Sequence, residues 1–513
     1  MSKKLLRPAR FAMACLAVCT GLCGCGDSTA PEPQPPATAA EESSTAKDES
    51  QWIVSMLNGS KIAHLRTALI ELPDRDDAAA WREEADIHMS VDRFGETATP
   101  SVSYRGELNA QGELLSFECT TRFGKQPRQF IGTRKDGQLQ IKEGNGRPTI
   151  IDCPAGCGGF LAVEFSLEQK PLEPGETRTI VRYDAVSETL ATEELVAKSN
   201  EQTQLPSGTA ELLRIEQSTH LASGNAITQV IWADGSGQIR KSVALNTGNE
   251  QYVVSKEQAL APAENPVDLA WATSVPLNRP LTNAHNTYRA RYRVQLENSN
   301  PAQVFPQGSG QTVTPITEHT ADLIVKAVRP MPLISGPRQS SESPPTAADV
   351  QPNAWIQCDD ATIVNLAESV ALDEVDSWKV AQALERLVHD RMRSHNFNTA
   401  MASAAEVAQS LEGDCTEHAV LLTALLRARE IPSRVAVGLV HTETLGGFGF
   451  HMWSEAYIHG TWIPLDATLG RGGTGAAHIR LSSTSLSGAE GLANLLPVAQ
   501  VMGQLKIDVL EVE

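Results

Sequence analysis

A thiol at the predicted start of a helix, followed by an imidazole and a carboxylate on two predicted strands, constrains this chain most. Cys415 follows Gly413 and opens an apolar run that reaches Arg427, and His451 and Asp466 come later. The first turn of a helix offers free N–H groups and a positive dipole end, which favour a thiolate. A cysteine nucleophile also needs a base and a group that orients the base. The order of residues therefore predicts a cysteine-dependent active site.

The spacing around His459-Gly460 brings the imidazole and the carboxylate together. If this pair is a two-residue hairpin turn, Ile458 pairs with Thr461, and Asp466 lies diagonally opposite His451 on the same face of the sheet. A shift of one residue in the register would place them on opposite faces. A lone cysteine, histidine or aspartate is more often structural. The three together favour catalysis.

These residues belong to an ordered series of motifs that resembles the bacterial form of the transglutaminase-like superfamily. The resemblance covers roughly residues 355–481, and the matching stretches are 413–417, 419–428, 431–434, 437–438, 450–455 and 462–468. It implies a papain-like arrangement in which one helix packs on an antiparallel sheet. It also implies that Cys415 is the nucleophile, His451 the general base and Asp466 its orienting partner.

Other residues in the same motifs are given supporting roles or none. Trp453 and Glu455, on the predicted strand of His451, are expected to pack around the site. His418 lies nearly one helical turn beyond Cys415, and we assign it no role.

The C-terminal part reads as helices followed by strands. Apolar spacing predicts a helix over 377–392, a short helix that Ser403 and Glu406 cap and Gly413 ends, and a buried helix over 415–427. Strands are expected at 435–440, 452–458 and 461–464, with a late closing strand at 505–509.

The larger N-terminal part reads as mostly β structure. Strands are predicted at 101–108, 137–141, 178–183 and 238–244, and in a smaller unit at 287–296 and 321–328. Trp52 to Ile70 is predicted to be one early amphipathic helix, around which the antiparallel sheet would curl. We see no catalytic motif in this part, so it is interpreted as a scaffold or a binding unit.

The fold class is therefore α+β, with a papain-like C-terminal domain preceded by mostly β domains. The expected divisions are a signal peptide (1–24), a disordered tether (25–50), a mostly β domain with an N-terminal helix (51–262), a small β domain (263–334), a linker (335–354), the transglutaminase-like domain (355–481) and a C-terminal extension (482–513).

The first residues resemble a bacterial lipoprotein signal. Basic residues precede the apolar, small-residue run from Phe11 to Cys23, which is too short to span a bilayer. The run closes on Leu22-Cys23-Gly24-Cys25, so Cys25 is the predicted lipidation site, although Cys23 departs from the more usual alanine or serine. An ordinary secretory signal is the alternative. Either case predicts export to the bacterial cell envelope, and lipidation would anchor the chain there without a spanning helix.

The charge and the cysteines limit the possible partners. The net charge of −19 disfavours nucleic acid and anionic headgroups. Beyond the leader lie Cys119, Cys153, Cys157, Cys358 and Cys415. Their odd number leaves at least one thiol unpaired, and the other four can form two disulfides in three ways. Cys153 and Cys157 lack a second ligand pair, so no metal and no cofactor are expected.

The leading hypothesis is acyl chemistry on an amide or peptide bond through a thioester, with hydrolysis favoured over cross-linking because water is always available. The substrate would be a protein or peptide, and the sequence leaves its identity and the oligomeric state open. The rival hypothesis is a non-catalytic envelope lipoprotein that binds a partner through its β domains. Thiol redox exchange is disfavoured because Cys415 has no vicinal resolving cysteine.

Overall fold

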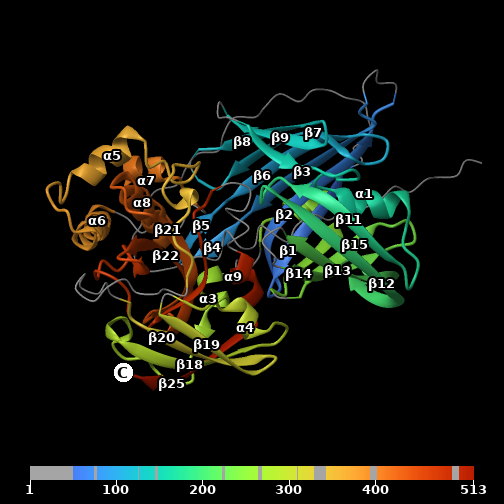
Figure 1. Ribbon diagram of the computed structural model, residues 1–513. Helices are drawn as coiled ribbons and strands as arrows, with labels where there is room; N and C mark the ends of the chain where they lie inside the picture. Colours follow the sequence, from blue (N-terminus) through green and yellow to red (C-terminus); the bar gives the residue numbers. More distant parts are fainter. Residues whose placement is uncertain are drawn as a thin grey trace, which may run out of the picture.

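The computed structural model describes residues 50–513 except 74–77, 125, 145–147, 222–225, 246, 264–267, 309, 329–341, 393–400 and 488–495 (Figure 1). The predicted signal peptide, Cys25, nearly all of the tether and part of the linker lie outside the described residues. The described residues are 47% strand and 18% helix, in agreement with an α+β description. No helix within the described ranges is long and apolar enough to cross a membrane.

The N-terminal part is one antiparallel sheet of fourteen strands, in the order β10-β9-β8-β7-β6-β3-β2-β1-β16-β15-β14-β13-β12-β11. The chain runs outward from β1 to β10 and returns from β11 to β16, which pairs with β1. Its strands are β1 (Gln51–Leu57), β2 (Ser60–Glu71), β3 (Trp81–Met89), β6 (Ser101–Leu108), β7 (Leu114–Arg122), β8 (Arg128–Lys135), β9 (Gln138–Glu143), β10 (Thr149–Asp152), β11 (Thr177–Asp184), β12 (Thr189–Leu205), β13 (Gly208–Leu221), β14 (Ala226–Ala233), β15 (Ile239–Ala244) and β16 (Glu250–Val254).

The prediction of a helix over Trp52 to Ile70 is wrong, because this segment forms the β1–β2 hairpin. Asn58 and Gly59 make its turn with φ of 51° and 79°. Asn-Gly between apolar runs is a strong signal for a two-residue hairpin turn, since both residues tolerate positive φ. That local signal overrides the helical spacing of the apolar residues.

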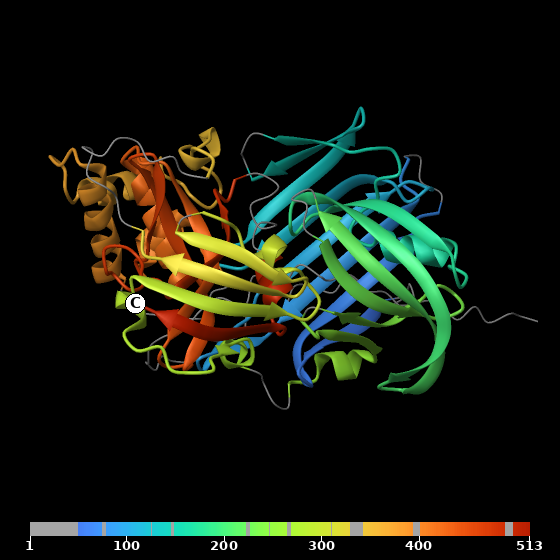
Figure 2. The ribbon, with the colours of Figure 1, turned by 60° about the horizontal axis from the view of Figure 1, so that its bottom comes forward.

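The helix that packs on this sheet is instead α1 (Ala162–Gln169). Its Phe165 lies edge-on to Trp81 of β3 at 5.6 Å between ring centroids, while the helix also packs on β11. Because β3 and β11 stand far apart in the strand order, the sheet must curve to reach both, as Figure 2 shows. Glu83 of β3 holds the start of this helix by accepting N–H bonds from Phe160 and Leu161 at 3.0 and 2.8 Å.

A second, four-stranded sheet contains both the small β unit and the end of the chain. Its order is β19-β20-β18-β25, with β18 (Arg289–Leu296), β19 (Gln311–Thr317), β20 (Thr320–Lys326) and β25 (Leu505–Val512). The predicted closing strand is therefore confirmed as β25, which pairs with β18. Short helices α2 (Lys256–Leu260), α3 (Leu269–Ala272), α4 (Pro301–Val304) and α9 (Leu496–Val501) accompany the sheets.

The C-terminal part packs four helices on an antiparallel sheet in the order β17-β22-β21-β24, to which β23 adds by pairing with β22. In Figure 1 the helices lie together on one side of β21 and β22. The elements are α5 (Ala361–Glu368), α6 (Ser377–Arg391), α7 (Ala404–Ser410), α8 (Cys415–Ala428), β17 (Val275–Pro276), β21 (Ser433–Thr442), β22 (Gly447–Ile458), β23 (Thr461–Leu465) and β24 (His478–Thr484).

Two local predictions in this part have different outcomes. The capping box of Ser403 and Glu406 is confirmed at the start of α7. The prediction that Gly413 ends this helix is wrong, because Leu411 takes the left-handed cap position with φ of 54°. Gly413 instead directly precedes Asp414, the N-cap of α8.

None of the three possible disulfide pairings is formed. Cys119, Cys153, Cys157, Cys358 and Cys415 are all buried and take part in no disulfide. Cys119 lies on β7 of the large sheet, whereas Cys358 precedes α5 in the C-terminal part. Cys153 and Cys157 are close enough for their thiols to hydrogen-bond.

Candidate active site

Cys415 is the first residue of α8, the buried helix at the centre of the C-terminal part. Asp414 is the N-cap, and its Oδ1 accepts the N–H of Thr416 at 2.8 Å. Glu417 completes a capping box by accepting the N–H of Asp414 at 3.0 Å. Gly413 has φ of 140°, and a Cβ there would lie 2.4 Å from Glu417, so this turn requires glycine. These contacts fix the direction in which the helix presents Cys415.

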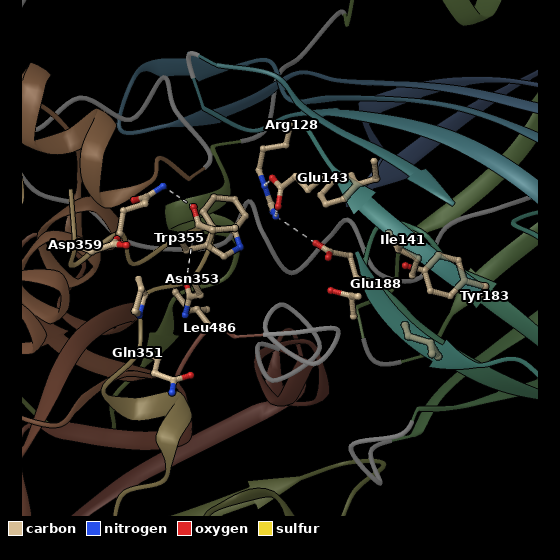
Figure 3. Close-up of a pocket in the computed structure, with 16 residues that line it drawn as sticks. Arg128, Ile141, Glu143, Tyr183, Glu188, Gln351, Asn353, Trp355, Asp359 and Leu486 are labelled. Carbon is tan, nitrogen blue, oxygen red and sulfur yellow. Dashed lines mark hydrogen bonds and ion pairs between the residues drawn. The ribbon is translucent and has the colours of Figure 1, made fainter. Parts of the chain in front are cut away.

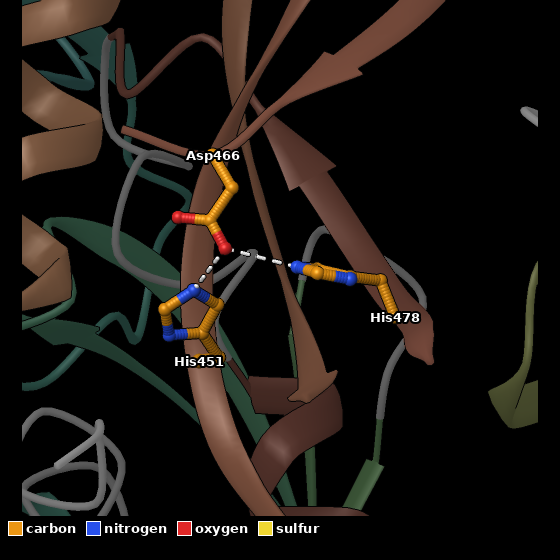
Figure 4. Close-up of side chains that lie close together, drawn as sticks. All are labelled: His451, Asp466 and His478. Atoms are coloured by element: carbon orange, nitrogen blue, oxygen red, sulfur yellow. Dashed lines mark hydrogen bonds and ion pairs between the residues drawn. The ribbon is translucent and has the colours of Figure 1, made fainter. Parts of the chain in front are cut away.

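The β22–β23 hairpin has the register that the sequence predicts. His459 and Gly460 form the turn with φ of 50° and 81°, and Ile458 pairs with Thr461. The strand β23 ends at Leu465, so Asp466 is the next residue. Nε2 of His451 lies 2.8 Å from Oδ2 of Asp466 (Figure 4). The predicted imidazole and carboxylate are therefore in direct contact.

The electrostatics of this pair favour an imidazolium beside a carboxylate. Burial alone lowers the pKa of His451, but Asp466 and Cys415 outweigh it and hold that pKa well above its usual value. Burial likewise opposes ionisation of Asp466, yet His451 and His478 hold its pKa well below the usual range. His451 also hydrogen-bonds to Cys415. All three predicted residues thus meet, with exposed fractions of 2%, 2% and 1% for Cys415, His451 and Asp466.

His478 is a fourth member of the cluster that the sequence reasoning missed. Its Nε2 lies 2.9 Å from the same Oδ2 of Asp466, so two imidazoles share one carboxylate oxygen (Figure 4). It lies on β24, which pairs with β21 on the side away from β23. The ring of Trp453 stacks on His451 at 6.2 Å and meets the ring of His478 edge-on at 5.3 Å. Trp453 therefore packs both imidazoles against Asp466.

A buried acid on α6 holds the segment that carries Asp466. Oε1 of Glu385 accepts the N–H of Asp466 at 3.0 Å and that of Gly473 at 3.2 Å. Burial raises the pKa of Glu385 to about 7. On the other side, Oδ1 of Asp466 accepts the N–H of Thr468 at 3.0 Å. The backbone of Asp466 and Oδ1 of its carboxylate are thus both held, which leaves Oδ2 for the imidazoles.

Glu455 and His418 have contacts of their own. Glu455 lies between two arginines, accepting from Nε of Arg434 at 2.8 Å and from Nη1 of Arg480 at 3.1 Å. It therefore joins β22 to β21 and β24. Nδ1 of His418 lies 2.6 Å from the carbonyl oxygen of Asp414, one turn earlier on the helix.

His451, Asp466 and His478 also have the composition of a metal site. Their ligand atoms lie within 4.8 Å of one another, the one such group among the residues described. However, both nitrogen–oxygen contacts have the length of hydrogen bonds, which accounts for the cluster without an ion. A cation bound there would also occupy the nitrogen that His451 uses to contact Asp466.

Comparisons with known proteins agree with the motifs. Residues 364–467 match the family model of the transglutaminase-like superfamily. A solved structure named a "Putative Cysteine Protease from Cytophaga hutchinsonii" aligns over 44% of this chain and 89% of its own, with 15% identity and a TM-score of 0.29. A "Putative Protease" from Parabacteroides distasonis aligns over 70% and 65%, with 12% identity and a TM-score of 0.18.

A third solved structure aligns with another share of the chain. It is a β-barrel-like protein of a domain of unknown function from Brucella abortus, with 40% of this chain and 95% of its own covered, 9% identity and a TM-score of 0.31. All three likenesses are too distant to assign a fold or an activity. No curated protein matches the chain. The resemblance seen in the motifs is nevertheless confirmed, and the segment 364–467, which carries Cys415, His451 and Asp466, belongs to the transglutaminase-like superfamily.

Proposed function

We propose that this protein performs cysteine-dependent acyl chemistry on an amide or peptide bond through a thioester on Cys415. The observation that carries the proposal is the continuous contact from Cys415 to His451 to Asp466. Superfamily membership of the same segment supports a cysteine-type enzyme in general. The substrate would be a protein or peptide, and no cofactor or metal takes part.

Each residue has a defined task in the proposed reaction. The Cys415 thiolate attacks the carbonyl carbon and forms a C–S bond, while the imidazolium of His451 gives its proton to the leaving amine as the C–N bond breaks. Water, or a second amine, then attacks the thioester with His451 as the base, and the thiolate is released. Asp466 orients the imidazole and stabilises its charged form throughout.

The start of α8 stabilises negative charge in the site mainly through the helix dipole, because not all of its first N–H groups are available. The positive end of the helix favours negative charge on sulfur and on an oxyanion. However, Oδ1 of Asp414 already accepts the N–H of Thr416, so that amide is engaged by the cap. The Thr416 N–H is therefore not available to an oxyanion.

The direct test is to trap the thioester. We expect full-length protein treated with an acyl-transferring activity-based probe to gain the mass of one acyl group on the Cys415 peptide. Hydroxylamine should release that group, because thioesters are far more labile to it than amides. Cys415→Ala should stay unmodified, whereas Cys358→Ala, which removes a buried thiol of the same part of the chain, should acylate like wild type. Equal labelling of wild type and Cys415→Ala would reject the proposal.

One observation favours the rival, non-catalytic function. All three residues are almost fully buried, so a substrate carbonyl cannot reach the sulfur unless the protein opens. A binding lipoprotein would not need that opening. The rival predicts that Cys415→Ala retains both partner binding and cellular phenotype, whereas the catalytic proposal predicts that the phenotype is lost while binding persists.

We also propose that the chain is exported and lipid-anchored in the bacterial cell envelope through Cys25. The supporting pattern is the basic leader, the short apolar run and the closing cysteine. When the full sequence is expressed in a bacterial host with an alkyne-tagged fatty acid, wild type should carry the tag and fractionate with membranes. Cys25→Ala should lose both, and Cys23→Ala should retain both. Tagging of Cys25→Ala would contradict the assignment.

A further inference from the structure

Two loops of the large N-terminal sheet reach the helix that carries Cys415. The first is a hairpin tip of β4 (Val91–Arg93) and β5 (Glu96–Ala98), which extends the paired strands β3 and β6. The N–H of Met89 bonds to the carbonyl of Pro100 at 3.0 Å, so the tip continues directly from the main sheet. In Figure 1 it lies beside β21 and β22, in the seam between the two parts of the molecule.

The tip places a buried arginine on the cap of the catalytic helix. Nη1 of Arg93 donates to Oδ2 of Asp414 at 3.1 Å, and the two side chains are 1% and 2% exposed. The other oxygen of the same carboxylate caps Thr416. One side chain, directly before Cys415 in the chain, therefore joins the start of α8 to a sheet 321 residues away in the sequence.

The second loop, between β7 and β8, reaches the other half of the capping box. The carbonyl of Phe123 accepts the N–H of Met401 at 3.2 Å. The next N–H, that of Ala402, donates to Oε1 of Glu417 at 2.9 Å. Both residues of the capping box that starts α8 are therefore linked to the N-terminal sheet, one through a side chain and one through the backbone.

Further contacts show that these loops are firmly packed. The turn of the tip, Phe94-Gly95, has φ of 50° and 83°, and Phe94 lies 6.5 Å from the ring of Trp271 on α3. Beside the second loop, the guanidinium of Arg128 lies 4.7 Å from the ring of Phe130 and 4.3 Å from that of Trp355 (Figure 3). A cavity of about 1160 Å³ adjoins this stack. Arg128, on β8 of the large sheet, thus contacts Trp355 of the C-terminal part.

The positive charge of Arg93 affects Cys415 because its partner Asp414 is the residue directly before that cysteine. Burial raises the pKa of both carboxyl groups of the capping box, that of Glu417 well above its usual value, whereas the Arg93 guanidinium at 3.1 Å favours the charged form of Asp414. An unpaired carboxylate one residue before Cys415 would disfavour a thiolate. The charged or titratable groups at this end of the helix are Asp414, Glu417 and His418 on α8, Arg93 on β4, and His451 with Asp466 across from it.

We propose that the N-terminal sheet is a working part of the cysteine site, with Arg93 as a positioning residue that fixes the start of α8 and offsets the Asp414 charge beside Cys415. The inference rests on the proposed role of Cys415 as nucleophile. It assigns the β4–β5 tip of the N-terminal part a role in the reactivity of Cys415, beyond that of a spacer or a partner-binding unit.

The test measures the pH midpoint for alkylation of Cys415 by iodoacetamide in the full chain, followed by mass spectrometry of the Cys415 peptide. Arg93→Met should raise the midpoint by about one pH unit, the size expected when the charge of a neighbouring carboxylate is no longer compensated at the effective dielectric of proteins. Arg93→Lys should lie close to wild type. Adding Asp414→Asn to Arg93→Met should restore the midpoint to within about 0.3 pH units, because asparagine keeps the cap and removes the charge.

Matched variants separate this result from misfolding and from failure of the proposed function. Arg66→Met removes an arginine whose ion pairs, to Glu84 and Asp86, stay within the same sheet, and it should leave the midpoint unchanged. If Arg93→Met does not fold, the double variant decides, since only electrostatic coupling predicts its wild-type midpoint. An unchanged midpoint in folded Arg93→Met, or an equal shift in the double variant, overturns the inference. Absence of a thioester in wild type, with the midpoint still shifted, would reject the enzyme and not the coupling.

Discussion

Replacing His451 by glutamine lowers the rate of Cys415 alkylation at pH 6.5 by about 100-fold. In the wild type, Asp466 and Cys415 raise the pKa of His451 above its usual value despite burial, so the imidazolium persists beside a thiolate into the neutral range. Glutamine can still donate to Asp466 but carries no charge. The buried thiol then has no cationic partner, so its pKa lies at or above the ordinary value of about 8.5, which leaves about 1% thiolate or less at pH 6.5.

The pH profile is the discriminating measurement. Wild type should react at a nearly constant rate from pH 6 upward, whereas the rate of the variant should rise about tenfold per pH unit to at least about pH 8.5. Because Cys415 is buried, both rates also depend on transient opening, which cancels in the comparison if both proteins melt alike. His220→Gln, at a half-exposed histidine of the large sheet, is the control and should match wild type. Identical profiles for wild type and His451→Gln would show that the two groups do not interact.

The core of this site was predictable because short-range features position it. The His459-Gly460 turn fixes the register of β22 and β23, and that register places His451 and Asp466 on one face. The start of α8 is likewise local, since Asp414 and Glu417 cap it within four residues. Where the geometry depends on residues close in sequence, pattern and spacing are sufficient.

The other members of the site depend on contacts between distant segments. His478 reaches Asp466 because β24 pairs with the far side of β21, after a loop that imposes no register. Arg93 reaches Asp414 only because two parts of the chain that are 321 residues apart in the sequence pack together. No spacing rule in one sequence encodes either contact.

The error over Trp52 to Ile70 has a different cause. Its apolar residues satisfy the helical period, whereas the Asn58-Gly59 pair between them indicates a hairpin turn. The segment becomes two strands because each pairs on both sides, β1 with β16 and β2 with β3. Tertiary pairing thus decides between two periodicities that the residues alone permit.

Replacing Glu455 by alanine destabilises the C-terminal part by about 3–5 kcal/mol, the range measured when one partner of a buried ion pair is removed. Glu455 is 1% exposed and faces Arg434 and Arg480, which also pair with Glu342. Two guanidinium groups and two carboxylates balance one another in this network. Without Glu455, a buried positive charge is left uncompensated between β21, β22 and β24, and the melting temperature should fall by about 10 °C.

Thermal melts followed by circular dichroism check this, with Glu297→Ala as the matched control. Glu297 pairs with Lys506 at 3.4 Å, but both side chains are more than 60% exposed, so this removal should hardly change the melting temperature.

Burial opposes ionisation of Glu455, yet Arg480 and Arg434 hold its pKa below the usual value. Its stabilisation is therefore present above the unfolded pKa of about 4.3 and is lost as the pH falls through the folded value. The gap between wild type and Glu455→Ala should accordingly narrow on acidification, and equal melting at neutral pH would show that the network contributes no net stability.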